Sequence, residues 1–146
     1  MLLIDTIGSV LEPDDKELYC AWPDVIKLEN MYAMHYSTLT DSKQKCINFA
    51  TSEDGFIWEK RGTCITPSIE ADEMGLARSH VMYDDSKKSF VMFYDGISAK
   101  DNKHRICAAV SDDGISNWRK LGVVLDLPDN GDEWDSHGLS NPHAIE

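Results

Sequence analysis

Short apolar segments alternate with polar turns along the whole chain. They are rich in β-branched and aromatic residues and lack the i, i+3, i+4 spacing of an amphipathic helix. Such segments are found at 24–27, 31–36, 81–83, 90–94 and 106–110. Ser, Asp, Gly and Pro interrupt every window in which a helical stripe could develop. The pattern predicts an all-β fold without a long helix.

Two segments of the chain carry nearly the same sequence. Residues 50–60 (ATSEDGFIWEK) and 109–120 (AVSDDGISNWRK) each contain a Ser-x-Asp-Gly turn followed by Trp and Lys. Glycine reaches positive φ without steric cost, and Asp bonds the backbone two residues ahead, so both turns are expected to join antiparallel strands. Strand-like segments precede both turns in the same order. A unit that recurs every 55 to 60 residues or so is typical of a β-propeller or another stacked array.

The repeat predicts one partial propeller domain over residues 1–146. Two complete units are expected at about 12–67 and 68–127, with partial blades at 1–11 and 128–146. Each complete unit reads as a four-stranded antiparallel blade, so the chain is predicted to hold about 2.5 blades. The first strand of a third unit is expected at 141–145.

Composition narrows the possible partners. The chain has 146 residues, is 42% hydrophobic and carries a formal charge of −12. The charge disfavours nucleic acid and anionic membranes, because no basic stripe can displace phosphate counterions. Neutral sugars and cationic groups stay open as ligands. No apolar run is long enough to span a membrane, and Met1–Ile4, followed at once by Asp5, does not read as a secretory signal.

The cysteines lack the paired spacing of a zinc site. They stand at Cys20, Cys46, Cys64 and Cys107. Reduced thiols in a cytoplasmic protein are the favoured interpretation, and a secreted protein with one or two disulfides is the alternative. No cofactor is expected.

The candidate functional site lies where the units begin. Three segments, named here the opening triplets, occupy matching places: Trp22-Pro23-Asp24, Arg78-Ser79-His80 and Asn141-Pro142-His143. In a propeller the first strand of each blade lines the central channel, so polar groups at these starts should converge on one mouth. Asp24 is the candidate catalytic carboxylate. The candidate substrate-binding residues are Trp22, Arg78, His80, Asp135, Asn141 and His143.

Structural interpretations of the same residues stay open. Asp24 could cap a strand or pair with Arg78, whose fork of donors could otherwise hold a carboxylate or hydroxyls of a ligand. His80 and His143 could be hydrogen-bonded residues of inner strands. Two histidines and a carboxylate could bind a metal, but the same groups serve equally well to bond sugar hydroxyls, so no metal is assigned. Acidic loops are expected to enter the units at 12–20, 68–74 and 127–135. They could supply a general acid, which the sequence does not single out.

The chain resembles the arabinanase, levansucrase and invertase superfamily, five-bladed β-propeller glycosidases that include glycoside hydrolase families 32 and 43. The resemblance is carried by residues 22–26 and 78–83 with the strands that follow them, by both Ser-x-Asp-Gly turns, and by residues 134–138 before the third triplet. It implies hydrolysis or transfer at a glycosidic bond, with an Asp and a Glu on inner strands and a second Asp that tunes the acid. The chain departs from this pattern in two places. Ser79 stands where these enzymes typically carry the Asp of Arg-Asp-Pro, and no Glu opens the third unit.

The resemblance also bears on assembly and on the competing functions. Five blades would need roughly twice these residues, so either the chain is a fragment or two copies form a homodimer that completes the ring. A carbohydrate-active propeller that acts on a glycosidic bond is the first hypothesis. A non-catalytic carbohydrate- or protein-binding propeller fragment is the alternative. A sialidase-like propeller fits less well, because its Asp-box has one more residue between Asp and Gly.

Overall fold

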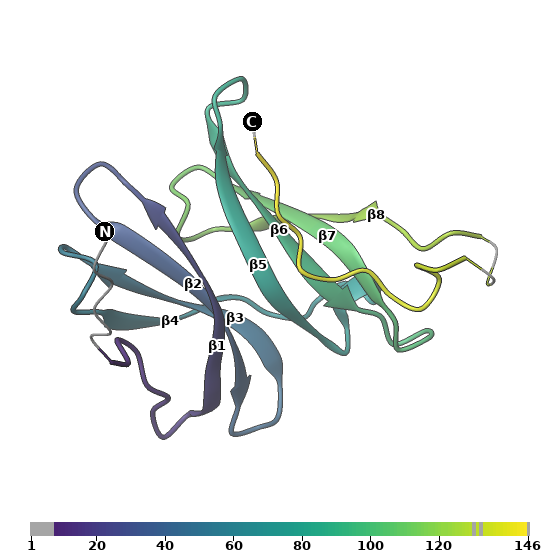
Figure 1. Cartoon of the computed structure of the whole chain (residues 1–146), viewed down its shortest axis with the longest axis horizontal. Helices are drawn as coiled ribbons and strands as arrows, with labels where there is room; N and C mark the ends of the chain where they lie inside the picture. The colour runs from purple at the N-terminus through teal and green to yellow at the C-terminus, as the bar shows by residue number, and fades with distance from the viewer. Residues whose placement is uncertain (1–7, 130, 132, 146) are drawn as a thin grey trace, which may run out of the picture.

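The computed structural model describes residues 8–129, 131 and 133–145. Two four-stranded antiparallel sheets, each with its strands in sequence order, make up the fold (Figure 1). The first contains β1 (Glu17–Lys27), β2 (Tyr32–Thr40), β3 (Lys45–Ser52) and β4 (Glu59–Ile65). The second contains β5 (Gly75–Asp84), β6 (Ser89–Ile97), β7 (His104–Ser111) and β8 (Arg119–Leu125). A 3-10 helix, Glu70–Asp72, lies between them. The predicted all-β, blade-like architecture is confirmed.

The repeated turns owe their shape to local side-chain hydrogen bonds. Ser52 Oγ accepts the N–H of Gly55 at 2.9 Å, and Ser111 Oγ accepts the N–H of Gly114 at 3.2 Å. Both glycines have positive φ, 80° and 73°, a conformation that costs glycine little. The Asp of each turn accepts further backbone N–H groups. These local bonds explain why the turn sequence recurs in both sheets.

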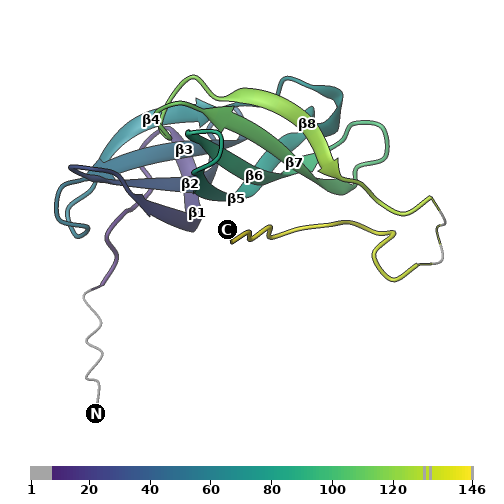
Figure 2. The same cartoon turned by 90° about the horizontal axis from the view of Figure 1, so that it is seen from above.

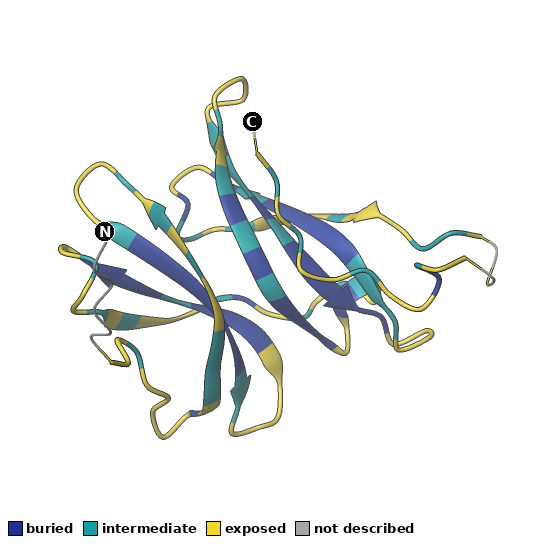
Figure 3. Ribbon diagram, viewed as in Figure 1, coloured by how far each residue is buried: buried dark blue, intermediate teal, exposed yellow. Residues whose placement is uncertain are grey.

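The main core lies between the two sheets. Strand β5 packs across β1, β2 and β3, and buried side chains from both sheets form one cluster. It includes Ile47, Ile65, Val81, Met92 and Tyr94. In Figure 3 the buried positions follow the middle strands, while β4 and β8 are largely exposed. Apolar packing of β5, the first strand of the second sheet, against the first sheet therefore holds the two sheets together, as in a stacked array.

Each sheet also has a tyrosine and a lysine that bind one buried carboxylate, which belongs to the 3-10 helix for the second sheet and to β1 for the first. Asp72, fully buried, accepts hydrogen bonds from Tyr94 Oη at 2.9 Å and from Lys120 Nζ. In the first sheet, Glu17 accepts corresponding bonds from Tyr36 and Lys60. Lys60 and Lys120 stand at matching places of the outer strands, so these triads fix the last strand of each sheet to the segment that enters it.

Two local predictions were wrong. The loop expected over 12–20 ends earlier, because β1 already begins at Glu17, whose buried carboxylate is satisfied by the triad. The strand expected at 141–145 forms no ladder in the described residues. That segment is extended and runs beside β5 (Figures 1 and 2), where side chains hold it.

The domain division stays a prediction. Both sheets fall within the expected complete units. Of the partial blades, residues 1–7, 130, 132 and 146 lie outside the described residues, as does the Met1–Ile4 segment. Over the part that is described, a search for helices long and apolar enough to cross a membrane gave none.

Candidate functional site

The three opening triplets line one small pocket of about 200 Å³. Six of the seven residues selected from the sequence meet there: Trp22, Asp24, Arg78, His80, Asn141 and His143. Asp135 does not line this pocket. Its Oδ1 is buried in the loop that precedes the third triplet, and none of the described residues hydrogen-bonds to it. Residues far apart in the sequence are therefore brought together as the repeat predicted, with Asp135 as the exception.

The first residue of each triplet has a left-handed backbone. Trp22, Arg78 and Asn141 have φ of 51°, 49° and 56°. At Trp22 and Arg78 the ladder register shifts, which marks a β-bulge in β1 and in β5. Positive φ is uncommon for residues other than glycine and tends to cluster at functional sites. The same unusual geometry in three units supports a shared role for the triplets.

Asp24 joins the first sheet to the second. Its Oδ2 accepts the N–H of Val81 at 2.7 Å, and its Oδ1 lies 3.2 Å from His80 Nδ1. The suggested pairing of Asp24 with Arg78 is wrong, because Arg78 binds Asp95 instead, at 2.8 Å. Both carboxylate oxygens are thus engaged, and the side chain keeps 20% of its surface exposed.

His80 makes a related contact one unit further on, to a backbone carbonyl instead of a backbone N–H. Its Nε2 lies 2.9 Å from the carbonyl oxygen of Ala144, which is the counterpart of Val81 in the third unit. The ring of His143 stacks on His80, with 4.2 Å between the centroids and 17° between the planes. The ring of His143 therefore covers one face of the His80 ring.

Arg78 and Trp22 form the part of the pocket that is best suited to bind a ligand. The guanidinium of Arg78 lies 4.5 Å from the centroid of the Trp22 ring, and Nη1 also donates to Ser140 Oγ at 2.8 Å. Trp22 is 44% exposed. An exposed aromatic plate beside planar hydrogen-bond donors can pack against a sugar ring and bond its hydroxyls.

Three polar residues of this region were not predicted from the sequence as binding groups. Ser79 lines the pocket, and its buried Oγ has no hydrogen-bond partner among the residues that the structure describes. Asp95 is fully buried beneath Arg78, and Ser140 bridges the two. Asp95 gave a signal in the sequence, a lone carboxylate in the apolar segment 90–97, but its partners are distant in the chain.

Cysteine and metal chemistry find no support at this pocket. All four cysteines are free, and none of them lines it. Burial raises the pKa of Cys64 to about 12 and that of Cys107 to about 11, so both stay protonated at neutral pH. Among the residues that the structure describes, no group of three or more His, Cys, Asp or Glu is arranged to hold a metal ion.

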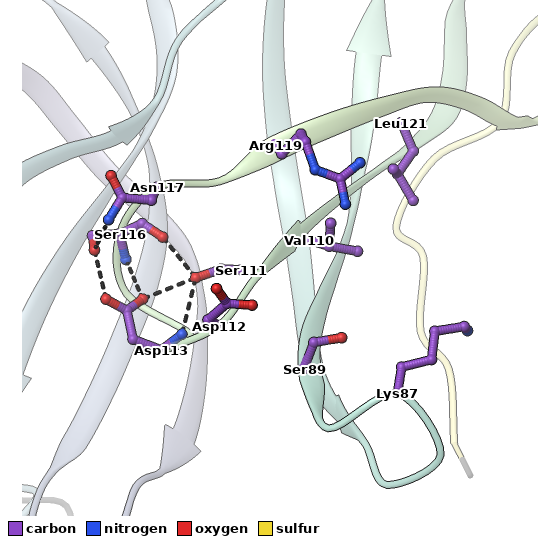
Figure 4. A pocket seen from close by; sticks show the side chains of 10 residues that line it. All are labelled: Lys87, Ser89, Val110, Ser111, Asp112, Asp113, Ser116, Asn117, Arg119 and Leu121. Atoms are coloured by element: carbon purple, nitrogen blue, oxygen red, sulfur yellow. Dashed lines mark hydrogen bonds between the residues drawn. The ribbon is translucent and has the colours of Figure 1, made fainter.

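A larger hollow of about 520 Å³ lies beside the second repeated turn (Figure 4). Figure 4 shows Ser111, Asp113 and Ser116 bonded to one another at its edge. Although partial burial acts against it, hydrogen bonds from Ser116 and the backbone lower the pKa of Asp113 to about 2. A similar hollow lies beside the turn of the first sheet. We therefore assign these hollows to the repeat architecture.

The family of the chain follows from a comparison with known protein families. The profile of the "Glycosyl hydrolases family 32 N-terminal domain" matches residues 23–136. The chain belongs to this family. The match covers both sheets from Pro23 onward, including the second opening triplet. A search of curated protein sequences gave no match.

Solved structures of glycoside hydrolases share the fold of this family 32 chain. A family 117 glycoside hydrolase, Zg3597, of Zobellia galactanivorans matches with a TM-score of 0.71 and 16% identity, over 84% of this chain and 43% of that one. A glycosyl hydrolase from Bacteroides ovatus matches with a TM-score of 0.62 and 16% identity, over 83% and 34%. A family 43 β-1,3-galactosidase matches with a TM-score of 0.54 and 19% identity, over 70% and 32%.

These likenesses concern the fold. The family 32 chain spans less than half the length of each of the three structures. Its two sheets correspond to part of the propeller of those enzymes.

Proposed function

We propose that this chain binds a carbohydrate in the pocket formed by the opening triplets, as part of a glycoside hydrolase propeller. One observation carries the proposal. Three segments from successive units, each with a left-handed first residue, converge on one pocket in a chain that belongs to a glycoside hydrolase family.

The chemistry of the pocket favours a neutral sugar. Trp22 offers an apolar face, and Arg78 and Asn141 offer donors. Within the described ranges of the chain, the buried hydroxyl of Ser79 has no hydrogen-bond partner that a ligand would need to displace. The charge of Arg78 is already balanced by Asp95, and the chain as a whole carries −12, so an anionic ligand would be repelled. At about 200 Å³, the pocket is smaller than the ~300–1,000 Å³ of common ligand sites and suits a single ring.

Hydrolysis of a glycosidic bond is the second candidate, favoured by family membership. Glycosidases of the usual kind need two carboxyl groups on either side of the bond. Among the described residues that line this pocket, Asp24 is the one carboxylate. Turnover would therefore require a second carboxyl group from elsewhere, and catalysis by Asp24 stays a proposal for the whole protein.

The binding proposal is tested with a panel of furanosides, xylosides, mannosides and fructans, titrated by calorimetry. We expect one class to bind, and Arg78→Ala to weaken its affinity at least tenfold, about 1.4 kcal/mol. Arg119→Ala, which changes an exposed arginine beside the turn hollow, is the matched control and should bind normally. Absence of binding across the panel, or equal affinity of Arg78→Ala and wild type, would contradict the proposal.

Asp24→Asn separates binding from catalysis. The amide oxygen can still accept the N–H of Val81, so we expect a loss of about 1 kcal/mol in unfolding free energy, from a charged to a neutral hydrogen bond. Sugar affinity should change by less than tenfold. If wild type hydrolyses a glycoside and the variant loses about 10²–10⁴ of that rate while still folded, Asp24 is catalytic and our ranking of the two candidates is reversed.

A further inference from the structure

Asp95 lies beneath the pocket and contacts two of its three triplets. It stands on β6, and its carboxylate is fully buried. Its Oδ2 accepts hydrogen bonds from Arg78 Nη1 at 2.8 Å and from Ser140 Oγ at 2.7 Å, while Oδ1 accepts the N–H of Asn141 at 3.0 Å. His104 Nδ1 lies 3.6 Å from Oδ2. One carboxylate thus connects the second unit to the segment that begins the third.

The first sheet contains the same junction without the charge. Ser37 is the counterpart of Asp95, because each lies on the second strand of its sheet opposite the alanine that precedes a triplet. Ser37 Oγ accepts the N–H of Arg78 at 2.7 Å, as Asp95 accepts that of Asn141. In both junctions a second-strand side chain holds the left-handed residue of the next unit. A hydroxyl is sufficient for that task.

The carboxylate at position 95 therefore has a second task. A buried charge is costly unless it is paired and hydrogen-bonded. An aspartate at this place therefore implies a charged partner, which a serine hydroxyl could not neutralise. That partner is Arg78, whose side chain is 26% exposed and would otherwise be free to extend into water. Tied to Asp95, the guanidinium stays over the Trp22 ring.

We propose that Asp95 is the positioning residue of the pocket: it fixes Arg78 against Trp22 and holds Asn141 in its left-handed conformation, without reaching the sugar itself. The inference rests on the proposed carbohydrate site. Asp95 thus makes two kinds of contact. Serine could replace its hydrogen bond with the N–H of Asn141 but not its ion pair with Arg78.

Three variants separate the two contacts in the absence of sugar. Asp95→Ala removes both, whereas Asp95→Ser, which copies Ser37, and the isosteric Asp95→Asn each keep an acceptor for the N–H of Asn141. Hydrogen exchange of the Asn141 amide should accelerate at least tenfold in Asp95→Ala and stay within about threefold of wild type in the other two. The indole N–H resonance of Trp22 should shift in all three, toward its position in Arg78→Ala. An unshifted Trp22 resonance in a folded Asp95→Asn protein would overturn the proposal.

Sugar affinity supplies the second test. Asp95→Asn should weaken binding as much as Arg78→Ala, at least tenfold, and the double variant should be no weaker than either single variant, because both changes remove the same interaction. Additive losses would show that Asp95 acts independently of Arg78 and would contradict the inference. If no sugar binds at all, the proposed function fails, while the exchange and indole measurements still decide the role of Asp95.

Discussion

Replacing Asp72 by alanine is expected to lower the free energy of unfolding by about 3–5 kcal/mol, the usual cost of removing one partner of a buried ion pair. Asp72 has no exposed surface, and it accepts hydrogen bonds from Lys120, Tyr94 and the backbone N–H groups of Ser68 and Ile69. The variant leaves the Lys120 ammonium, 10% exposed, without its carboxylate. Urea denaturation measures the loss.

The first sheet provides an internal comparison. Lys60, the counterpart of Lys120, is 20% exposed and also binds Asp14, so Glu17→Ala should cost less than Asp72→Ala. In the Asp72→Ala/Lys120→Met double variant no charge is stranded, and part of the stability should return. A loss below about 1 kcal/mol for Asp72→Ala would show that the triad does not hold the blade together.

Stability is expected to fall by about 2 kcal/mol between pH 7.5 and pH 5 because of one histidine. His35, on β2, has no exposed surface, and neither ring nitrogen makes a hydrogen bond of good geometry within the described part of the chain. Its ring packs against that of Trp118, just before β8, with 5.9 Å between the centroids. Burial lowers its pKa from 6.5 to about 4, although the Asp24 charge acts in the opposite direction. The unfolded chain therefore takes up a proton as the pH falls through 6.5, whereas the folded chain does not until about pH 4. The stability contributed by the neutral ring is complete above pH 6.5 and is lost below it.

His35→Phe is the natural test, because the counterpart of His35 in the second sheet is Phe93. Urea denaturation at pH 7.5, 6.5, 5.5 and 5 should give a flatter stability profile for His35→Phe than for wild type. His137→Gln, which removes an exposed histidine, should keep the wild-type slope. Equal slopes for His35→Phe and wild type would mean that the pH dependence arises elsewhere.

The fold was largely predictable because its signals are local. The Ser-x-Asp-Gly turns close through bonds between residues at most five positions apart, so their sequence alone specifies them. The alternation of apolar and polar residues then places most strands. The start of β1 was missed, because Glu17 looks like a loop residue until its partners Tyr36 and Asn48, on two other strands, are known.

The residues that meet at the candidate site were predictable from the sequence, but the hydrogen bonds between them were not. The repeat identified which residues occupy equivalent places, and equivalent places in stacked units converge. It could not reveal that Asp24 binds the backbone at Val81, or that Arg78 binds Asp95, since these contacts depend on the bulges and left-handed residues of the triplets. The pairing of Asp24 with Arg78, one of the alternatives that the sequence left open, assumed that neighbouring opposite charges meet, but Asp95 binds Arg78 instead.

Amide and indole chemical shifts can show whether a bound sugar occupies the pocket of the opening triplets. With the best ligand of the panel added to isotope-labelled protein, we expect the largest chemical-shift changes at Trp22, Arg78 and Asn141, where the three units meet. Shifts concentrated instead at Asn117 and Arg119, beside the turn hollow of Figure 4, would contradict it.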